Sequence, residues 1–161
     1  MTQIVVVSGN PRPASRTSAL AIAVGEALAA PGRPGVIEVG ALGPGLLTPG
    51  DSATATALDD IRSAGLLVVA TPTYKGSYTG VLKVLLDRLA PGALAGKRAV
   101  PVVTAGIAPQ AVAAEALLRQ LLIELGAEVL PGLPVIEADL PASGQLAATY
   151  AQDFHSHATA G

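Results

Sequence analysis

The first residues that could do chemistry lie between positions 8 and 17. Arg12 and Arg16 stand there among hydroxyl-bearing side chains, and the first acidic residue of the chain is Glu26. Guanidinium groups and hydroxyls are donors that can hold a phosphate. The hydroxyl candidates are Ser8, Ser15, Thr17 and Ser18. We predict a phosphate-binding loop here; the alternative is an ordinary strand-to-helix connection with two solvated arginines.

The elements beside this loop favour the first interpretation. Residues 4–7 are an unbroken run of β-branched side chains, typical of a strand buried on both faces. Pro11 and Pro13 end the strand, and Ser15 is a good N-cap for the helix that follows. A helix N-terminus offers free N–H groups and partial positive charge, so it attracts anions. The loop matches neither the P-loop motif nor the glycine-rich dinucleotide fingerprint.

Two further segments have the composition of ligand-binding loops. Residues 71–80 (TPTYKGSYTG) carry hydroxyls, two tyrosines and a lysine, and they follow the apolar run 66–70. Residues 104–107 (TAGI) follow a third apolar run, 99–104. The carboxyl ends of strands are where open α/β sheets bind ligands. We therefore expect both segments to border a site.

Apolar runs and helical patterns alternate along the chain, which predicts an α/β fold with a parallel sheet. Strands are expected at 4–7, 36–39, 66–70, 99–104 and 128–136, the last interrupted by Pro131-Gly132. Helices are expected at about 15–30, 51–64, 79–89, 110–125 and 142–154. Right-handed crossovers favour a doubly wound, five-stranded sheet in the order 2-1-3-4-5 with helices on both faces. In that order the three loops form the walls of one crevice, which fits a planar ligand that carries a phosphate.

Composition limits the classes of protein that this chain can be. With 161 residues, half of them hydrophobic, we expect a single domain over residues 1–161. The net charge is −2 and the cations are scattered, so neither nucleic acid nor a membrane surface is an expected partner. The absence of cysteine excludes thiol nucleophiles, disulfides and cysteine-ligated metals. No signal peptide or membrane span is visible, so a cytoplasmic protein is expected.

Three other segments carry weaker expectations. The helix at 110–125 is apolar around most of its circumference, so a second subunit is expected to cover it; alanine-rich composition alone is the alternative. The segment 40–50 is rich in glycine and proline and is expected to be a loop. His155 and His157 are expected in a frayed, solvated tail and not in a metal site.

The segment VATPTYKGSYTGVLKVLLDRL, with ALAGK soon after it, closely resembles the NAD(P)H-dependent FMN reductases. GNPRPASRTSAL resembles the phosphate loop of the same family, and the similarity runs from about residue 3 to residue 138. The flavin reductases of two-component alkanesulfonate monooxygenase systems are especially similar. The resemblance implies a flavodoxin-like fold, FMN and NADPH or NADH as ligands, and hydride transfer from nicotinamide to FMN. It also implies a homodimer or homotetramer and a monooxygenase that receives the reduced flavin.

The resemblance also implies a role for individual residues. Phosphate ligands would be Ser8, Arg12, Ser15, Arg16 and Thr17, with Asn10 in place of a family serine. The flavin would be lined by Pro72, Thr73, Tyr74 and Lys75, and Thr104, Ala105 and Gly106 would touch its far side. We expect backbone N–H groups of residues 73–76, which include Gly76, and of Gly106 to bind the flavin edge. The charge of Lys75 would favour reduced flavin, unless Lys75 is only a solvated loop lysine.

Three alternatives to an FMN reductase remain. A quinone or azo-compound reductase with tightly bound FMN needs the same crevice. A one-electron carrier is disfavoured because the chain is nearly neutral, and a non-enzymatic binder of a phosphate ligand is the third alternative.

The cofactors themselves carry out hydride transfer to flavin, so the protein needs no acid or base of its own. This fits candidate loops that contain no histidine or cysteine. The helix at 110–125 lacks the aromatic residue that sulfonate-linked relatives can carry there.

Overall fold

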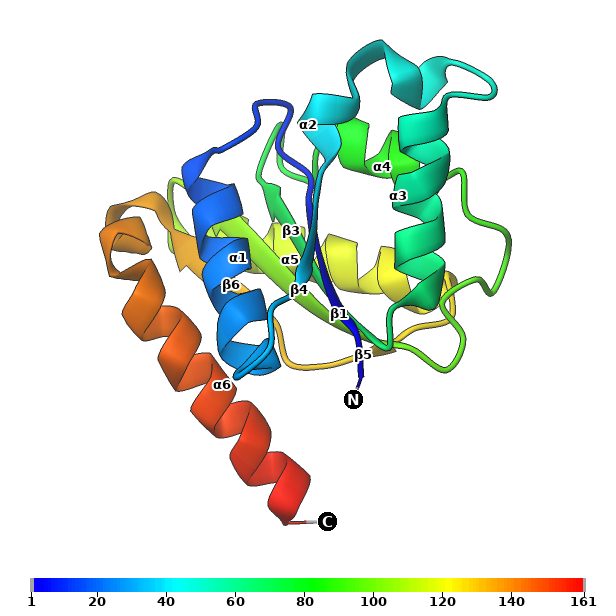
Figure 1. Cartoon of the computed structure of the whole chain (residues 1–161). Coiled ribbons are helices and arrows are strands. Elements are labelled where there is room, and N and C mark those ends of the chain that lie inside the picture. The colour runs from blue at the N-terminus through cyan, green and yellow to red at the C-terminus, as the bar shows by residue number, and fades with distance from the viewer. Residues whose placement is uncertain (1, 161) are drawn as a thin grey trace.

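A parallel β-sheet runs through the middle of the protein, with helices packed on both of its faces (Figure 1). The computed structural model describes residues 2–160, so the first and last residues of the predicted domain, 1 and 161, lie outside the described residues. The strands are β1 (Ile4–Ser8), β2 (Gly35–Glu38), β3 (Leu66–Pro72), β4 (Arg98–Ala105), β5 (Glu128–Val129) and β6 (Leu133–Ile136). The helices are α1 (Arg16–Ala29), α2 (Val39–Leu42), α3 (Ser52–Ser63), α4 (Gly80–Leu86), α5 (Ala108–Glu124) and α6 (Ser143–Thr159). Two 3-10 helices, η1 (Gly43–Leu47) and η2 (Glu137–Ala142), complete the described elements.

The order of the strands is the doubly wound one that the sequence predicts. Hydrogen-bonded neighbours follow the order β2-β1-β3-β4-β5, and every pair is parallel. A sixth strand, β6, also pairs with β4, beyond the point where β5 ends. The break falls at Pro131-Gly132, because proline cannot donate to the ladder. The interrupted last strand of the prediction is thus two short strands that share one neighbour.

The unbroken apolar strands are explained by burial on both faces. In β1, Val5 and Val7 pack in a core with α3, α4 and α5, whereas Ile4 and Val6 pack on the other face with α1 and α6. All four side chains are buried. Figure 1 shows the same division, with α1 and α6 on one side of the sheet and α3 and α4 on the other.

The segment 40–50 is not the open loop that the sequence predicts. Residues Val39–Leu42 form α2 and Gly43–Leu47 form η1, with Pro44 in the first turn, where its missing N–H costs nothing. Gly40 lies so close to Pro11 that a Cβ atom there would overlap the Pro11 carbonyl. This segment therefore packs directly against the first loop.

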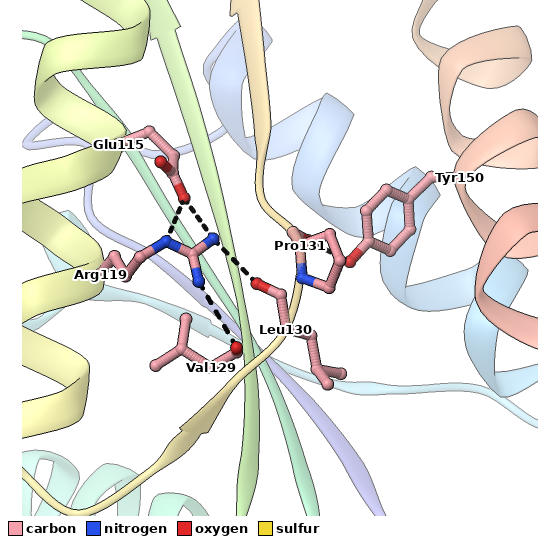
Figure 2. A network of polar contacts seen from close by, with 6 residues as sticks. All are labelled: Glu115, Arg119, Val129, Leu130, Pro131 and Tyr150. Atoms are coloured by element: carbon pink, nitrogen blue, oxygen red, sulfur yellow. Dashed lines mark hydrogen bonds and ion pairs between the residues drawn. The ribbon is translucent and has the colours of Figure 1, made fainter. Parts of the chain in front are cut away.

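Residues 129–131, between β5 and β6, are held from both sides (Figure 2). On one side, Arg119 of α5 donates to the carbonyl oxygens of Val129 (3.4 Å) and Leu130 (3.0 Å), while Glu115 accepts from the same guanidinium at 2.7 and 3.1 Å. On the other, the Tyr150 hydroxyl of α6 donates to the Pro131 carbonyl at 2.5 Å. These contacts fix the position at which β6 starts, and therefore also the position of η2, which follows β6.

Helix α6 continues beyond the point where the sequence predicts a frayed tail. His155 and His157 are exposed but helical, and the ring of His155 contacts Phe154 edge-on. The helix packs along α1, which supplies an apolar partner that the sequence pattern does not show.

Within residues 2–160, no helix has the length and apolar character needed to cross a membrane.

Candidate functional site

A crevice of about 200 Å³ opens at the carboxyl ends of the central strands. Its walls come from the three loops that the sequence singles out and from η2. The lining residues are Asn10, Arg12, Ser15, Arg16, Thr17, Pro72, Tyr74, Thr104, Glu137 and Leu140. A larger cavity of about 410 Å³ lies beside Tyr150 and Phe154, near Arg98 at the amino end of β4. That cavity is remote from the candidate loops, so we place the site in the smaller crevice.

The first loop, which the sequence predicts to bind phosphate, forms one side of the crevice. Asn10 Oδ1 accepts from the Arg12 backbone N–H at 2.9 Å, which folds the loop on itself. Ser15 is the N-cap of α1, and its hydroxyl accepts from the Ser18 N–H at 3.1 Å. Arg16 is the first residue of α1, and the first turn of this helix contains no acidic residue. The positive end of the helix dipole and two arginines therefore meet at one wall.

Buried serines support this loop from below. The hydroxyl oxygens of Ser8 and Ser18 are 2.6 Å apart, and Ser15 donates to Ser18 at 3.1 Å. Ser18 in turn donates to a carboxylate oxygen of Glu38 at 3.0 Å. Ser8 is fully buried and does not line the crevice. It lies where it can hold the loop in shape, one layer below the position at which a ligand would sit.

The second loop reverses direction at Lys75-Gly76. Both residues have positive φ (53° and 82°), and the backbone groups of Tyr74 and Ser77 bond reciprocally at 2.9 and 3.2 Å. These features describe a type I′ turn. The turn raises Tyr74 to the rim of the crevice, where the residue is 49% exposed. Lys75 and Gly76 themselves lie outside the lining.

Hydroxyl contacts tie the three loops together. The Thr79 side chain caps α4 and donates to the Gly9 carbonyl at 2.5 Å, which joins the second loop to the first. Thr73 donates to the Thr104 carbonyl at 2.9 Å, and the hydroxyls of Thr104 and Thr17 are 2.8 Å apart. Ala105 is buried and Gly106 is exposed, and both follow Thr104 without lining the crevice. Thr104 is thus the point where all three walls meet.

Sequence reasoning missed the fourth wall, which η2 supplies. Glu137 and Leu140 line the crevice, and a Glu137 carboxylate oxygen lies 4.0 Å from an Arg16 guanidinium nitrogen. The signal was available in the topology, because β6 runs parallel to β4 and must deliver its following residues to the same edge. The sequence does not reveal the register of β6 against β4, which places Glu137 opposite α1.

The donor set of the crevice fits the FMN that the resemblance implies. Two guanidinium groups and a helix N-terminus can hold a phosphate through charge-assisted hydrogen bonds. Pro72 and Tyr74, on the neighbouring wall, supply a pyrrolidine ring and an aromatic ring against which a ring system can pack. Every buried side-chain nitrogen and oxygen in the described part of the chain has a partner, so the crevice holds together without a ligand.

Comparison with known proteins gives one consistent family. Residues 2–139 match the model of the NADPH-dependent FMN reductase family. The chain is 40% identical over 79 residues to an FMN reductase (NADPH) of Escherichia coli (strain K12), a match that covers 48% of this chain and 41% of that protein. It is 39% identical over 83 residues to the NADH-dependent FMN reductase SfnF of Pseudomonas fluorescens (strain Pf0-1), with 51% of this chain and 44% of that protein covered. These matches therefore span less than half of the length of each relative.

A solved structure extends the similarity over almost the whole chain. The apo form of the NADH:FMN oxidoreductase EMOB superimposes with a TM-score of 0.76 at 30% sequence identity, and the match covers 95% of this chain and 90% of that one. Its fold is the flavodoxin-like one that the sequence resemblance implies. Because the family model takes in all three candidate loops and the described strands, the chain belongs to the NADPH-dependent FMN reductase family.

Proposed function

We propose that the protein is an NAD(P)H-dependent FMN reductase, which transfers a hydride from NADPH or NADH to FMN. One observation carries the proposal: in a member of this family, Arg12 of the first loop and Arg16 at the N-terminus of α1 line the same crevice as Pro72 and Tyr74. Donors for a phosphate and side chains that a ring system can cover therefore line one crevice. FMN supplies the hydride-accepting ring, so the chain has to bind and orient its ligands rather than transfer protons.

The proposed roles follow the walls of the crevice. Arg12, Arg16 and the free N–H groups of α1 would hold the phosphate, with Asn10, Ser15 and Thr17 beside them. Pro72, Thr73 and Tyr74 would lie against the ring, and the turn at Lys75-Gly76 would present backbone N–H groups to its edge. Thr104, Ala105 and Gly106 would complete the far side. Ser8 would act through the loop, because its buried hydroxyl faces Ser18.

The proposal is tested by NADPH and NADH oxidation, first without added flavin and then with increasing free FMN. A rate that needs FMN and saturates with it supports an FMN reductase that treats FMN as a dissociable substrate. A protein that is yellow as purified, and that turns over only with a quinone or an azo dye, would be the alternative reductase. No oxidation under any condition would leave a flavin carrier or a non-enzymatic binder.

We also propose that the protein is a homodimer or homotetramer. Helix α5 exposes two large apolar side chains on one side, Val112 (57%) and Ile123 (56%), because eleven residues make about three full turns; Leu117 (42%) is exposed on a different side of the helix. Apolar side chains on one helix face are a common basis for contacts between copies of a chain. Analytical ultracentrifugation of the wild type and of Ile123→Glu tests this: the variant should shift toward the monomer, and a monomeric wild type would refute the proposal.

The reduced flavin would be consumed by a flavin-dependent monooxygenase. This partner rests on the resemblance to the flavin reductases of two-component monooxygenase systems. Product formation by such a monooxygenase, supplied with NAD(P)H, FMN and this protein, would support the coupling. Product formation that is equal without this protein would contradict it. The cytoplasmic location expected from the sequence stays a prediction.

A further inference from the structure

Glu137 places a negative charge at the wall where we expect a phosphate. It is the first residue of η2 and follows Ile136, which pairs with Ala105 at the carboxyl end of β4. Leu140, three residues on, is buried against the α1 and α6 side of the core, so the backbone of η2 is anchored. The carboxylate is therefore held at the crevice by its backbone, although its side chain is 57% exposed.

The contact between Glu137 and Arg16 is loose. The closest approach of the charged atoms is 4.0 Å, and the Arg16 side chain is 68% exposed. An ion pair of this kind is weak and easily broken by a stronger partner. A phosphate dianion that binds at the N-terminus of α1 is such a partner, because it brings more charge and also meets Arg12 and the free N–H groups.

We propose that Glu137 sets the flavin affinity by competing with the phosphate for Arg16. The inference rests on the proposed function and deepens it, because it assigns to this residue a limit on how strongly the site prefers a flavin with a phosphate to one without. Glu137 neutralises part of the Arg16 charge in the free protein, and it repels the phosphate in the complex. Both effects weaken FMN binding, and neither acts on riboflavin, which has the same ring and ribityl chain but no phosphate.

The consequence for the reaction is a flavin that leaves readily. A reductase that hands over its product must release reduced FMN in every cycle, so the tightest phosphate site is not the most useful one. A carboxylate at the rim lowers the affinity without removing any of the donors that position the phosphate. Glu137 would thus favour the release of FMN, by the same modest factor by which it weakens FMN binding.

The test is the dissociation constant of FMN and of riboflavin for the wild type and for Glu137→Gln, measured by flavin fluorescence at low salt. Glu137→Gln keeps the size of the side chain and removes its charge. We expect FMN to bind about two- to fivefold tighter, the range that a weak surface ion pair covers, and riboflavin to bind unchanged. The increase in FMN affinity should be smaller at high salt, because the charges of Arg16 and Glu137 are exposed and salt screens them.

Asp139→Asn is the matched control, since it removes the same charge two residues away on an exposed position of η2. It should leave both constants unchanged. Arg16→Ala provides the second comparison: if Glu137 acts through Arg16, the gain from Glu137→Gln must be smaller in the Arg16→Ala background. A gain of the same size there would refute the competition for Arg16.

Two other results would overturn the proposal, and they separate it from the proposed function. Unchanged FMN affinity in Glu137→Gln, or an equal gain for riboflavin, would remove the role of Glu137 while leaving an FMN reductase intact. A wild type that binds no FMN would overturn the proposed function and this proposal together.

Discussion

The side-chain hydroxyl oxygens of Thr17 and Thr104 lie 2.8 Å apart, although 87 residues separate them in the chain. Thr17 is in the first turn of α1 and Thr104 is near the end of β4, and both residues are buried. Each hydroxyl is a hydrogen-bonding partner of the other across the floor of the crevice. The contact therefore joins the wall where we expect the phosphate to the wall that we expect on the far side of the flavin.

Replacing Thr104 by valine should destabilise the protein by about 1–3 kcal/mol, because the buried Thr17 hydroxyl loses its partner. Thr17→Val should cost a similar amount for the same reason. The double variant should be less destabilised than the sum of the two single variants, since it leaves no unpaired hydroxyl. Urea unfolding of the four proteins measures the coupling; additive effects would show that the contact contributes nothing.

The phosphate wall is tested by replacing Arg12 and Arg16 together with alanine. Each charge-assisted hydrogen bond from these guanidinium groups to the phosphate should contribute about 1.5–3 kcal/mol to FMN binding, so the double variant should bind FMN correspondingly more weakly. Riboflavin binding should be almost unchanged. A lysine pair at the same positions is the control that keeps the charge. FMN affinity equal to the wild type in the alanine variant would disprove the phosphate assignment.

Lys75 can be examined for its charge without disturbing its turn. Asparagine tolerates positive φ and is common in type I′ turns, so Lys75→Asn removes the charge and keeps the backbone. If the charge favours reduced flavin, the rate of NAD(P)H oxidation at saturating FMN should fall. Unchanged turnover would show that Lys75 is a solvated loop residue.

Gly76 is required for the backbone of the same turn. Its φ is +82°, where a Cβ atom is unfavourable, so Gly76→Ala should destabilise the loop by about 1 kcal/mol or more. Gly80, at the start of α4, has open space around a Cβ atom and no positive φ, so Gly80→Ala is the matched control. Thermal unfolding should separate the two variants, and equal melting temperatures would contradict the role of the turn.

Tyr150 makes the stability sensitive to alkaline pH. Burial raises the pKa of Tyr150 to about 12, against a small opposing effect of the Arg119 charge. The neutral phenol is thus favoured by folding, and this contribution is complete below pH 10 and is lost as pH rises toward 12. Urea unfolding across this window should show a steeper fall for the wild type than for Tyr150→Phe. Parallel curves would mean that Tyr150 ionises as easily in the folded protein as in the unfolded one.

The parts of the fold that depend on local pattern could be predicted from the sequence. The β-branched runs marked the buried strands, and Ser15 and Asp51 are helix N-caps with hydrogen bonds to Ser18 and Thr54. The segment 40–47 was missed because its glycines permit close packing, at Gly40 on Pro11, that no local rule reveals. Composition predicts a loop there, and tertiary contact makes short helices.

The sequence predicts the site residues that directly follow a strand. It does not predict those whose position depends on how two strands are paired. Arg12, Arg16, Tyr74 and Thr104 reach the crevice because their strands end at one edge. Glu137 reaches it only because β6 pairs with β4 beyond the break in the last strand. The partly buried hydrogen bond from Ser18 to Glu38 likewise needs the pairing of β1 with β2, which sequence spacing does not show.

The hydroxyls below the crevice bond to one another and to Glu38, and the described part of the chain leaves no buried side-chain polar atom without a partner. The conformational entropy needed to order this floor is therefore spent during folding and not during ligand capture. A ligand would meet a preorganised surface, and only exposed side chains at the rim, such as Tyr74 and Arg16, would have to settle around it. Association should then resemble docking to a rigid template, with little change in backbone hydrogen exchange below the crevice when a flavin binds.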